Sequence, residues 1–204
     1  MKRRDFLRVT LVGGAAAAVA PLDLWGKGTG KSGFTLWQLP SQVDTIGNSF
    51  VFLTDKGRVV VMDGGMNDET LFLRGFIAAL GNEVEAWFTS HPHNDHVGAL
   101  TKILQKPDGM KINKVYHSRF SDSLLACEAP YQQYALDYYE ALDKSGIEVA
   151  NQTEPGLTGQ IDGLNFKILG VTNEEFRTNP YNNSSMIIRV WDKAKSLVFL
   201  GDAG

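Results

Sequence analysis

The stretch FTSHPHNDHVGAL, residues 88–100, carries three of the four histidines of the chain, together with an aspartate. The residues that lead into it, VEAWFTS, have the composition of a strand, and those that follow, HVGALTKILQ, have the apolar spacing of a helix. A loop between a strand and a helix can turn several side chains toward one point. We therefore predict a strand, a loop that bears functional side chains, and a helix.

The side chains of this cluster are of the types that hold divalent metal ions. Imidazole nitrogen and carboxylate oxygen are ligands of zinc and similar ions. Residues two apart in a loop can point the same way, so His91 and His93 can share one ion, while Asp95 and His96 can turn toward a neighbouring position. Packing these groups together without a cation would be costly. The cluster therefore predicts one short loop that supplies ligands to two metal positions.

The segments around the cluster alternate between strand and helix patterns, which indicates an α/β fold with a parallel or mixed sheet. Strands are predicted at residues 34–39, 84–90, 112–118, 147–150, 164–170, 184–191 and 196–202, a hairpin at 47–65 with its turn at 55–57, and helices at 68–80, 96–105 and 129–146. Two of the strand segments, RVVVMD and SLVFLGD, are almost entirely apolar. Such runs are typical of strands that are covered on both faces.

The first residues have the pattern of an export signal. The basic stretch MKRRDFLRV precedes the apolar run TLVGGAAAAVA, which is shorter than the ~20 residues that a membrane-spanning helix needs. An amphipathic first helix is disfavoured because the run has no polar face. Arg3 and Arg4 resemble a twin-arginine signal, which exports folded proteins. We therefore expect an export signal at residues 1–20, a flexible lead-in at 21–33, and a bacterial protein that works in the periplasm or outside the cell.

Charge and composition limit the classes of function. The chain has a net charge of −3, and without residues 1–20, which carry +3, its net charge is −6. Nucleic-acid binders need a basic surface, so there is no strong nucleic-acid signature. Cys127 is the single cysteine, which excludes an intramolecular disulfide. We expect a small-molecule or phosphoester substrate and no membrane-spanning segment in the mature chain, and the sequence does not indicate an oligomeric state.

Three motifs together resemble the metallo-β-lactamase superfamily. They are the H-x-H-x-D-H pattern of residues 91–96, Asp63 in VVVMDGG, and Asp202 in LVFLGDAG. The resemblance covers residues 34–204. It implies an αββα sandwich, an α/β fold that some schemes class as α+β, with two zinc ions at one edge and iron or manganese as alternatives. Because the chain reaches Gly204 directly after the last motif, we expect the domain to be incomplete at its C-terminal end.

Within this superfamily the chain looks most like the branch that contains the C-terminal domain of the ComEC-type DNA-uptake proteins. The stretches that carry this likeness are SHPHNDHVGAL, NNSSMIIRV and LVFLGDAG. Asn183 and Ser185 match the Asn/Ser pair of that branch, although a polar turn before a strand explains them equally well. Most members have a further histidine ligand before the last aspartate. His117 could take that place or be structural, and the branch places its last histidines in positions that would follow Gly204.

The resemblance implies metal-assisted hydrolysis, in which a bound cation lowers the pKa of water from about 15.7 to about 7. The implied metal ligands are His91, His93, Asp95, His96 and Asp202, of which the first two hold one ion and the others hold the second, with Asp202 as the bridge. Asp95 would also be catalytic by orienting the attacking hydroxide. Asp63 would accept the free N–H of a ligand histidine, unless it is only a turn former before the following glycines.

These features predict a metal-dependent hydrolase that acts on an ester, phosphodiester or lactam. The fold alone does not fix the substrate. A non-catalytic or degenerate metal-binding module is the alternative, because ligands that the superfamily usually has are missing from residues 1–204.

Overall fold

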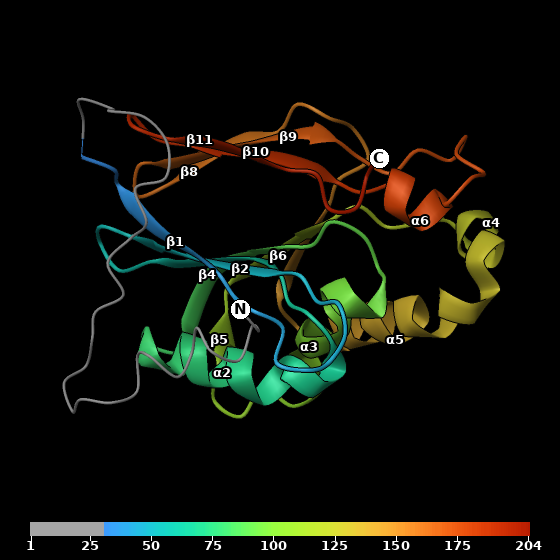
Figure 1. The fold of residues 1–204 in the computed structure, drawn as a ribbon, viewed down its shortest axis with the longest axis horizontal. Coiled ribbons are helices and arrows are strands. Elements are labelled where there is room, and N and C mark those ends of the chain that lie inside the picture. Colours follow the sequence, from blue (N-terminus) through green and yellow to red (C-terminus); the bar gives the residue numbers. More distant parts are fainter. Residues whose placement is uncertain (1–30) are drawn as a thin grey trace, which may run out of the picture.

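The computed structural model describes residues 31–204, which form two β-sheets and a layer of helices (Figure 1). The predicted export signal and most of the predicted lead-in lie outside the described residues. The larger sheet contains β1 (Phe34–Gln38), β2 (Ser49–Thr54), β3 (Val59–Asp63), β4 (Glu83–Phe88), β5 (Lys111–Ile112), β6 (Lys114–His117) and β7 (Glu148–Asn151). The smaller sheet contains β8 (Thr158–Ile161), β9 (Leu164–Gly170), β10 (Ile187–Trp191) and β11 (Ser196–Phe199).

The helices lie mainly on the face of the larger sheet that points away from the smaller sheet, where α2, α3 and α5 form a layer (Figure 1). The helical elements are η1 (Asn67–Glu69), α2 (Thr70–Ala79), α3 (Asn94–Gln105), α4 (Asp122–Leu125), η2 (Ala126–Glu128), α5 (Ala129–Ser145) and α6 (Pro180–Asn183). None of the helices in residues 31–204 has the length and apolar character that a membrane span requires.

The larger sheet is mixed, as the alternation of strands and helices predicted. Its strand order is β1-β2-β3-β4-β6-β7, with β5 paired to β4. The first three strands run antiparallel to one another, and β3, β4, β6 and β7 run parallel. Parallel strands bring their carboxyl ends to one edge of the sheet, which is where α/β folds usually place their functional residues. Asp63, at the end of β3, and the histidine cluster, after β4, therefore lie at the same edge.

Strand β3 is covered on both faces, as its apolar run predicted. All five of its residues are buried. Because successive side chains of a strand point to opposite faces, Val59 and Val61 join the core under the helices, while Val60 and Met62 join the core between the two sheets. Full burial of such a side chain stabilises the fold by roughly 1.5–3 kcal/mol. The strand that ends at Asp63 is thus anchored from both sides.

The histidine cluster differs from the prediction in where its loop ends. Helix α3 begins at Asn94, so Asp95 and His96 lie in its first turn and the loop ends at His93. An aspartate in the first turn is favourable because the N-terminal end of a helix carries partial positive charge. The regular geometry of the helix, and not a loop, therefore sets the relative positions of Asp95 and His96.

Strand β11 also differs from the prediction. Its apolar sequence predicted a strand covered on both faces, but β11 is an edge strand of the smaller sheet, and Val198 is 50% exposed. The inner face of β11 packs on the larger sheet, where the centroid of the Phe199 ring lies 5.0 Å from that of Phe50 in β2. On the outer face Leu169 is 42% exposed, and within residues 31–204 no helix covers that face (Figure 1). The described residues thus build three of the four layers of the sandwich.

Four short elements were not predicted, namely β8, α4, η2 and α6. Each has three or four residues, too few for a periodic pattern to stand out in the sequence. The hairpin, its turn at 55–57 and the three longer helices are confirmed, and Gly146 ends α5 in the left-handed conformation with φ 69°.

We expect Gly98 and Gly75, both within helices, to respond in opposite ways to replacement by alanine. A Cβ at Gly98 would lie 2.6 Å from the backbone nitrogen of Asn67, so Gly98→Ala should force α3 away from η1 and destabilise the fold by about 1–3 kcal/mol. Gly75 has nothing within 4 Å of the same position, and Gly75→Ala should stabilise the fold by about 0.5–1 kcal/mol. Urea unfolding measures both. Equal effects of the two changes would contradict the close packing of α3 on η1.

Candidate metal centre

The candidate metal centre lies where the loop after β4, residues 89–93 (the ligand loop), meets the start of β10 and the turn after β11. The backbone N–H of Met186, just before β10, donates to Ser90 O at 2.7 Å and so joins the two sheets at this point. After β11 the chain turns at Gly201, with φ 58°, and brings Asp202 to the cluster. A Cβ at Gly201 would lie 2.7 Å from both Ser185 Oγ and Ser90 Cβ. Only glycine allows this close approach.

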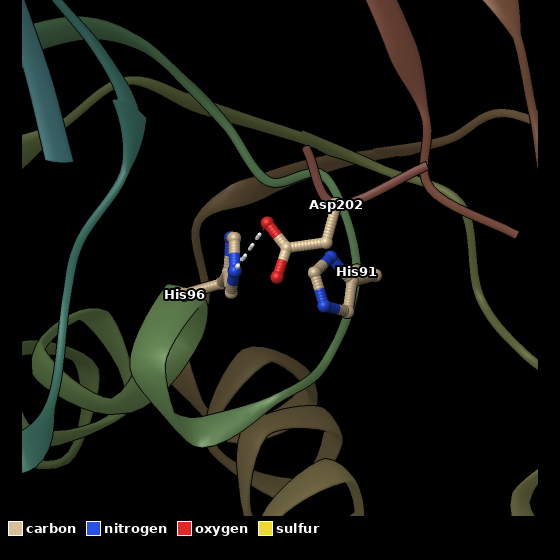
Figure 2. A group of neighbouring side chains, drawn as sticks. All are labelled: His91, His96 and Asp202. Carbon is tan, nitrogen blue, oxygen red and sulfur yellow. Dashed lines mark ion pairs between the residues drawn. The ribbon is translucent and has the colours of Figure 1, made fainter. Parts of the chain in front are cut away.

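His91, His96 and Asp202 each point a possible ligand atom at a common point, and these atoms lie within 4.8 Å of one another (Figure 2). His96 Nε2 lies 3.3 Å from Asp202 Oδ1 and 3.6 Å from Asp95 Oδ2. Two ligand atoms on a tetrahedral zinc, with bonds of about 2.0–2.1 Å, are about 3.3 Å apart. His96 Nε2 therefore lies about as far from each of these two carboxylate oxygens as two ligand atoms of one ion lie from each other.

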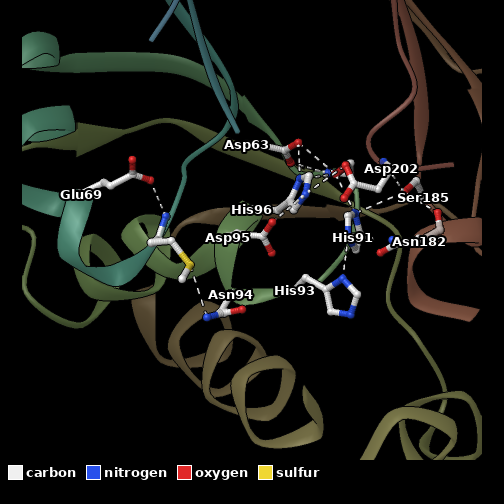
Figure 3. Close-up of polar contacts among 12 residues, drawn as sticks. Asp63, Glu69, His91, His93, Asn94, Asp95, His96, Asn182, Ser185 and Asp202 are labelled. Carbon is white, nitrogen blue, oxygen red and sulfur yellow. Dashed lines mark hydrogen bonds and ion pairs between the residues drawn. The ribbon is translucent and has the colours of Figure 1, made fainter. Parts of the chain in front are cut away.

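The side chains of His91 and His93 form a second group beside the first. His91 Nε2 and His93 Nδ1 are 2.9 Å apart, and both residues are buried. The ring of His91 also lies 4.1 Å, centroid to centroid, from the ring of His96. The five predicted ligands thus lie close together (Figure 3), but the three ligand atoms that converge, those of His91, His96 and Asp202, come from both predicted groups. That they bind metal stays a prediction.

Asp63 connects this cluster to the core of the larger sheet. Its Oδ1 accepts the backbone N–H of Ser90 at 2.7 Å, and its Oδ2 lies 2.9 Å from both Ser90 Oγ and His96 Nδ1. The indole N–H of the fully buried Trp87 donates to Asp63 O at 3.0 Å. These contacts hold Asp63 at φ 54°, a backbone conformation that costs a non-glycine residue about 1–3 kcal/mol.

The contact between Asp63 and His96 decides which nitrogen of His96 is free. A carboxylate only accepts hydrogen bonds, so His96 must carry a proton on Nδ1. In the neutral ring Nε2 then has a lone pair, and Nε2 is the atom that faces Asp95 and Asp202. Asp63 is therefore placed where the sequence implied, next to the histidine whose ring it would orient.

The charges around the cluster favour a cation. Burial lowers the pKa of His96, but the carboxylates of Asp63 and Asp202 outweigh that effect and raise the pKa to about 10. The hydrogen bond from His96 in turn lowers the pKa of Asp202. Burial holds the pKa of His91 well below its usual value, with His96 and His93 lowering it further. His91 is therefore neutral and able to act as a ligand, beside a point where carboxylates attract positive charge.

Ser185 lies inside the cluster and Asn183 at its border. Ser185 is buried, donates to Asn182 O at 2.7 Å, and has its Oγ 3.2 Å from His91 Nδ1. Asn183 ends α6, where its amide group donates to Thr178 O at 2.8 Å and its carbonyl oxygen accepts from a backbone N–H further along the chain. The structure thus supports a contact between Ser185 and a candidate ligand. For Asn183 it supports the turn-forming role.

His117 ends β6 as predicted, but it lies in the core beside α5. Its ring stands edge-on to the rings of Tyr138 and Tyr139, with centroids 6.1 and 5.9 Å away. It is 3% exposed, and its Nδ1 has no hydrogen-bond partner among the described residues. The geometry favours the structural role over a role as a further metal ligand.

Two residues of the centre were missed by sequence reasoning. Ser90 directly precedes the histidine motif and contacts Asp63, and its type alone carries no signal. Glu128 lies 3.0 Å, through Oε2, from His93 Nε2, and its Oε1 accepts the backbone N–H of Tyr181 at 2.9 Å. These partners are 35 and 53 residues from Glu128, so no local spacing could have indicated the contacts.

The fold and the cluster agree with the comparison to protein families. The family model of the metallo-beta-lactamase superfamily matches residues 43–204, and the chain belongs to this superfamily. The family to which it belongs has a divalent metal site and contains hydrolases. A comparison with curated protein sequences gives no match. The ComEC-type branch stays a prediction.

Solved structures with a similar fold are distant in sequence. A metallo-beta-lactamase with a HARLDQ motif from Cronobacter sakazakii is 14% identical with a TM-score of 0.52, and the match covers 80% of this chain and 58% of that one. The metallo-beta-lactamase fold protein YhfI from Bacillus subtilis is 15% identical with a TM-score of 0.49, covering 81% and 61%. The chain therefore spans about three fifths of the length of these proteins, and the likeness to the Cronobacter sakazakii protein concerns the fold alone.

We expect His117 to make the stability of the metal-free protein depend on pH. Burial, with a smaller effect of Arg119, lowers the pKa of His117 to about 4. The unfolded chain takes up a proton near pH 6.5 while the folded chain resists it until about pH 4. Stability is therefore fully present above pH 6.5 and falls as the pH drops through this window, by about 2–3 kcal/mol at pH 4.5.

The measurement is the free energy of unfolding in urea at pH 7 and at pH 4.5, for the metal-free wild type and for His117→Gln. Glutamine does not titrate, so its loss of stability between the two pH values should be smaller by that amount. Identical losses in the two proteins would show that His117 is not held neutral by the core.

Proposed function

We propose that this protein is a metal-dependent hydrolase with two divalent ions, and that these ions are zinc. The observation that carries the proposal is the closeness of five side chains of metal-binding type at the edge where the two sheets meet, with ligand atoms of His91, His96 and Asp202 within 4.8 Å of one another. The donor set of imidazole nitrogen and carboxylate oxygen fits zinc, with iron and manganese as the alternatives. When bound, a divalent ion would lower the pKa of water and polarise a substrate oxygen.

The residues of the chain would prepare this chemistry in distinct ways. His91 and His93 would hold one ion, and Asp95, His96 and Asp202 the other. Asp63 would keep the proton of His96 on Nδ1, so that Nε2 stays free. The Asp95 carboxylate, at the first turn of α3, would accept a hydrogen bond from the attacking water and so orient it toward the substrate.

The substrate class we propose is an ester, a phosphodiester or a lactam. The likeness to the ComEC-type branch favours phosphoester chemistry, whereas the net charge of −3 does not favour a nucleic-acid polymer. A non-catalytic metal-binding module is the second candidate. It is favoured by one observation: within residues 31–204 the fourth histidine, His117, lies against Tyr138 and Tyr139 and not beside His91 and His93.

We expect His93→Ala to lower the zinc content of the purified protein from two ions per chain to one, because the ion held by His91 and His93 would lose a ligand. The fold should be kept, since His93 lies on the loop before α3. Metal analysis by mass spectrometry together with circular dichroism measures both. His117→Gln is the matched control and should keep both ions. An unchanged zinc content in His93→Ala would overturn the assignment of this side chain as a ligand.

We expect the zinc-loaded protein to hydrolyse at least one of three chromogenic substrates: a phosphodiester, a carboxylic ester and a cephalosporin. Asp95→Asn should reduce kcat by about 100-fold or more, because a neutral amide holds the ion and orients the attacking water less strongly than a carboxylate does. Two bound ions without turnover of any substrate would favour the non-catalytic module.

We also propose that residues 1–20 direct export of the folded protein, on the strength of Arg3 and Arg4 before the apolar run. Expressed in a bacterium, the full chain should be recovered from the periplasmic fraction or the medium. Replacing both arginines by lysine should retain it in the cytoplasm, because this type of signal depends on the arginine pair and not on charge alone. Unchanged export of the double-lysine chain would exclude the twin-arginine route.

A further inference from the structure

We propose that Glu128 is a positioning residue of the metal centre, which fixes the proton of His93 on Nε2 and leaves Nδ1 free to bind the ion. This inference rests on the proposed metal site. Glu128 is the last residue of η2, next to α5, and its side chain is only 13% exposed. One carboxylate oxygen, Oε2, lies 3.0 Å from His93 Nε2, and the other, Oε1, accepts the backbone N–H of Tyr181.

The chemistry of this contact determines the tautomer of His93. A neutral imidazole carries one proton, on either of its two nitrogens, and a carboxylate can only accept a hydrogen bond. Contact with Glu128 therefore places the proton on Nε2. Nδ1 is then left with its lone pair, and it is Nδ1 that lies 2.9 Å from Nε2 of His91, in the group assigned to one ion.

The side chains packed around His93 fix the plane of its ring but do not decide which nitrogen carries the proton. The ring is stacked on that of Tyr181, with centroids 5.0 Å apart at 27°, and Tyr131 stands edge-on to it at 4.7 Å. The hydroxyl of Tyr181 donates to Leu125 O, which fixes the ring on which His93 rests. Because packing already sets the plane of the His93 ring, the contribution of Glu128 is to select the nitrogen that carries the proton.

A carboxylate thus orients a histidine in each of the two ligand groups, but the two act on opposite nitrogens. Asp63 keeps one proton of His96 on Nδ1, so that Nε2 is the nitrogen open to a metal ion, whereas Glu128 holds the proton of His93 on Nε2, which leaves Nδ1 open. In each ring the freed nitrogen is the one that faces the other candidate ligands. The carboxylate partners of metal-binding histidines commonly change metal affinity by 10–100-fold.

The test is Glu128→Gln, which keeps the size of the side chain and the contact with Tyr181. The amide oxygen can still accept the Tyr181 N–H, but the amide nitrogen then faces His93 and donates to Nε2. This should move the His93 proton to Nδ1 and block the ligand atom. We expect zinc affinity, measured by competition with a chromogenic chelator, to fall by about 10–100-fold for one of the two ions. Glu128→Ala, which removes the acceptor without adding a donor, should have a smaller effect.

A spectroscopic readout separates positioning from a structural role. In the metal-free protein labelled with ¹⁵N, the His93 ring should show Nε2–H in the wild type and Nδ1–H in Glu128→Gln. Glu140→Gln is the matched control, because Glu140 is exposed on α5 and pairs with Lys144. It should change neither affinity nor tautomer. Unchanged zinc affinity in Glu128→Gln, or an Nδ1–H tautomer already present in the wild type, would overturn the proposal.

The outcomes also distinguish this proposal from the proposed hydrolase. A wild type that binds zinc tightly but hydrolyses nothing, together with weakened binding in Glu128→Gln, would refute the hydrolase and support the role of Glu128. A wild type that hydrolyses substrate, together with unchanged zinc affinity in Glu128→Gln, would refute only the role of Glu128. A wild type that binds no zinc would refute both.

Discussion

The buried carboxylate of Asp63 is the constraint on which the rest of the centre depends. It accepts hydrogen bonds from the backbone and the hydroxyl of Ser90 and from the ring of His96, so it fixes both the start of the ligand loop and the first turn of α3. A buried carboxylate is costly unless such contacts satisfy it. Asp63 is also anchored mechanically, because β3 is buried on both faces and Trp87 holds its carbonyl oxygen. Because β3 is held in place by the core, Asp63 at its end holds Ser90 and His96 in fixed positions.

The geometry of the centre also requires that the two sheets pack against each other in one fixed relative position. Four of the five candidate ligands belong to the loop after β4 and the first turn of α3, but Asp202 follows β11 of the smaller sheet. The close approach at Gly201 and the hydrogen bond from Met186 N–H to Ser90 O place Asp202 beside His96. The apolar core between the sheets, with Phe88 and Phe166 in contact at 5.0 Å, therefore also determines the geometry of the centre. The stability of the fold and the geometry of the candidate metal centre therefore depend on the same packing.

Much of this arrangement could be predicted from the sequence, because it depends on local patterns. The strand, the histidine cluster and the helix are contiguous, and Asp63 and Asp202 stand in motifs that resemble those of a superfamily. The features that could not be predicted depend on long-range contacts, or on the outer face of the smaller sheet, which no helix covers within residues 31–204. Glu128 reaches the centre through partners 35 and 53 residues away, and nothing in its neighbourhood marks it. The apolar residues of β11 indicate burial, yet Val198 is half exposed at the edge of the smaller sheet.

The charged groups at the centre bear on the proposal that it holds two divalent ions. Three carboxylates, those of Asp63, Asp95 and Asp202, contact His96, and a fourth, that of Glu128, contacts His93. Without metal, burial lowers the pKa of His96, but the nearby carboxylates outweigh that effect and raise the pKa to about 10. His96 therefore holds an extra proton at neutral pH. One divalent ion that displaced this proton would still leave an excess of negative charge in a largely buried site, which is unfavourable. Two divalent ions carry four positive charges and would balance the four carboxylates while all three histidines stay neutral, which is the state in which imidazole binds a metal.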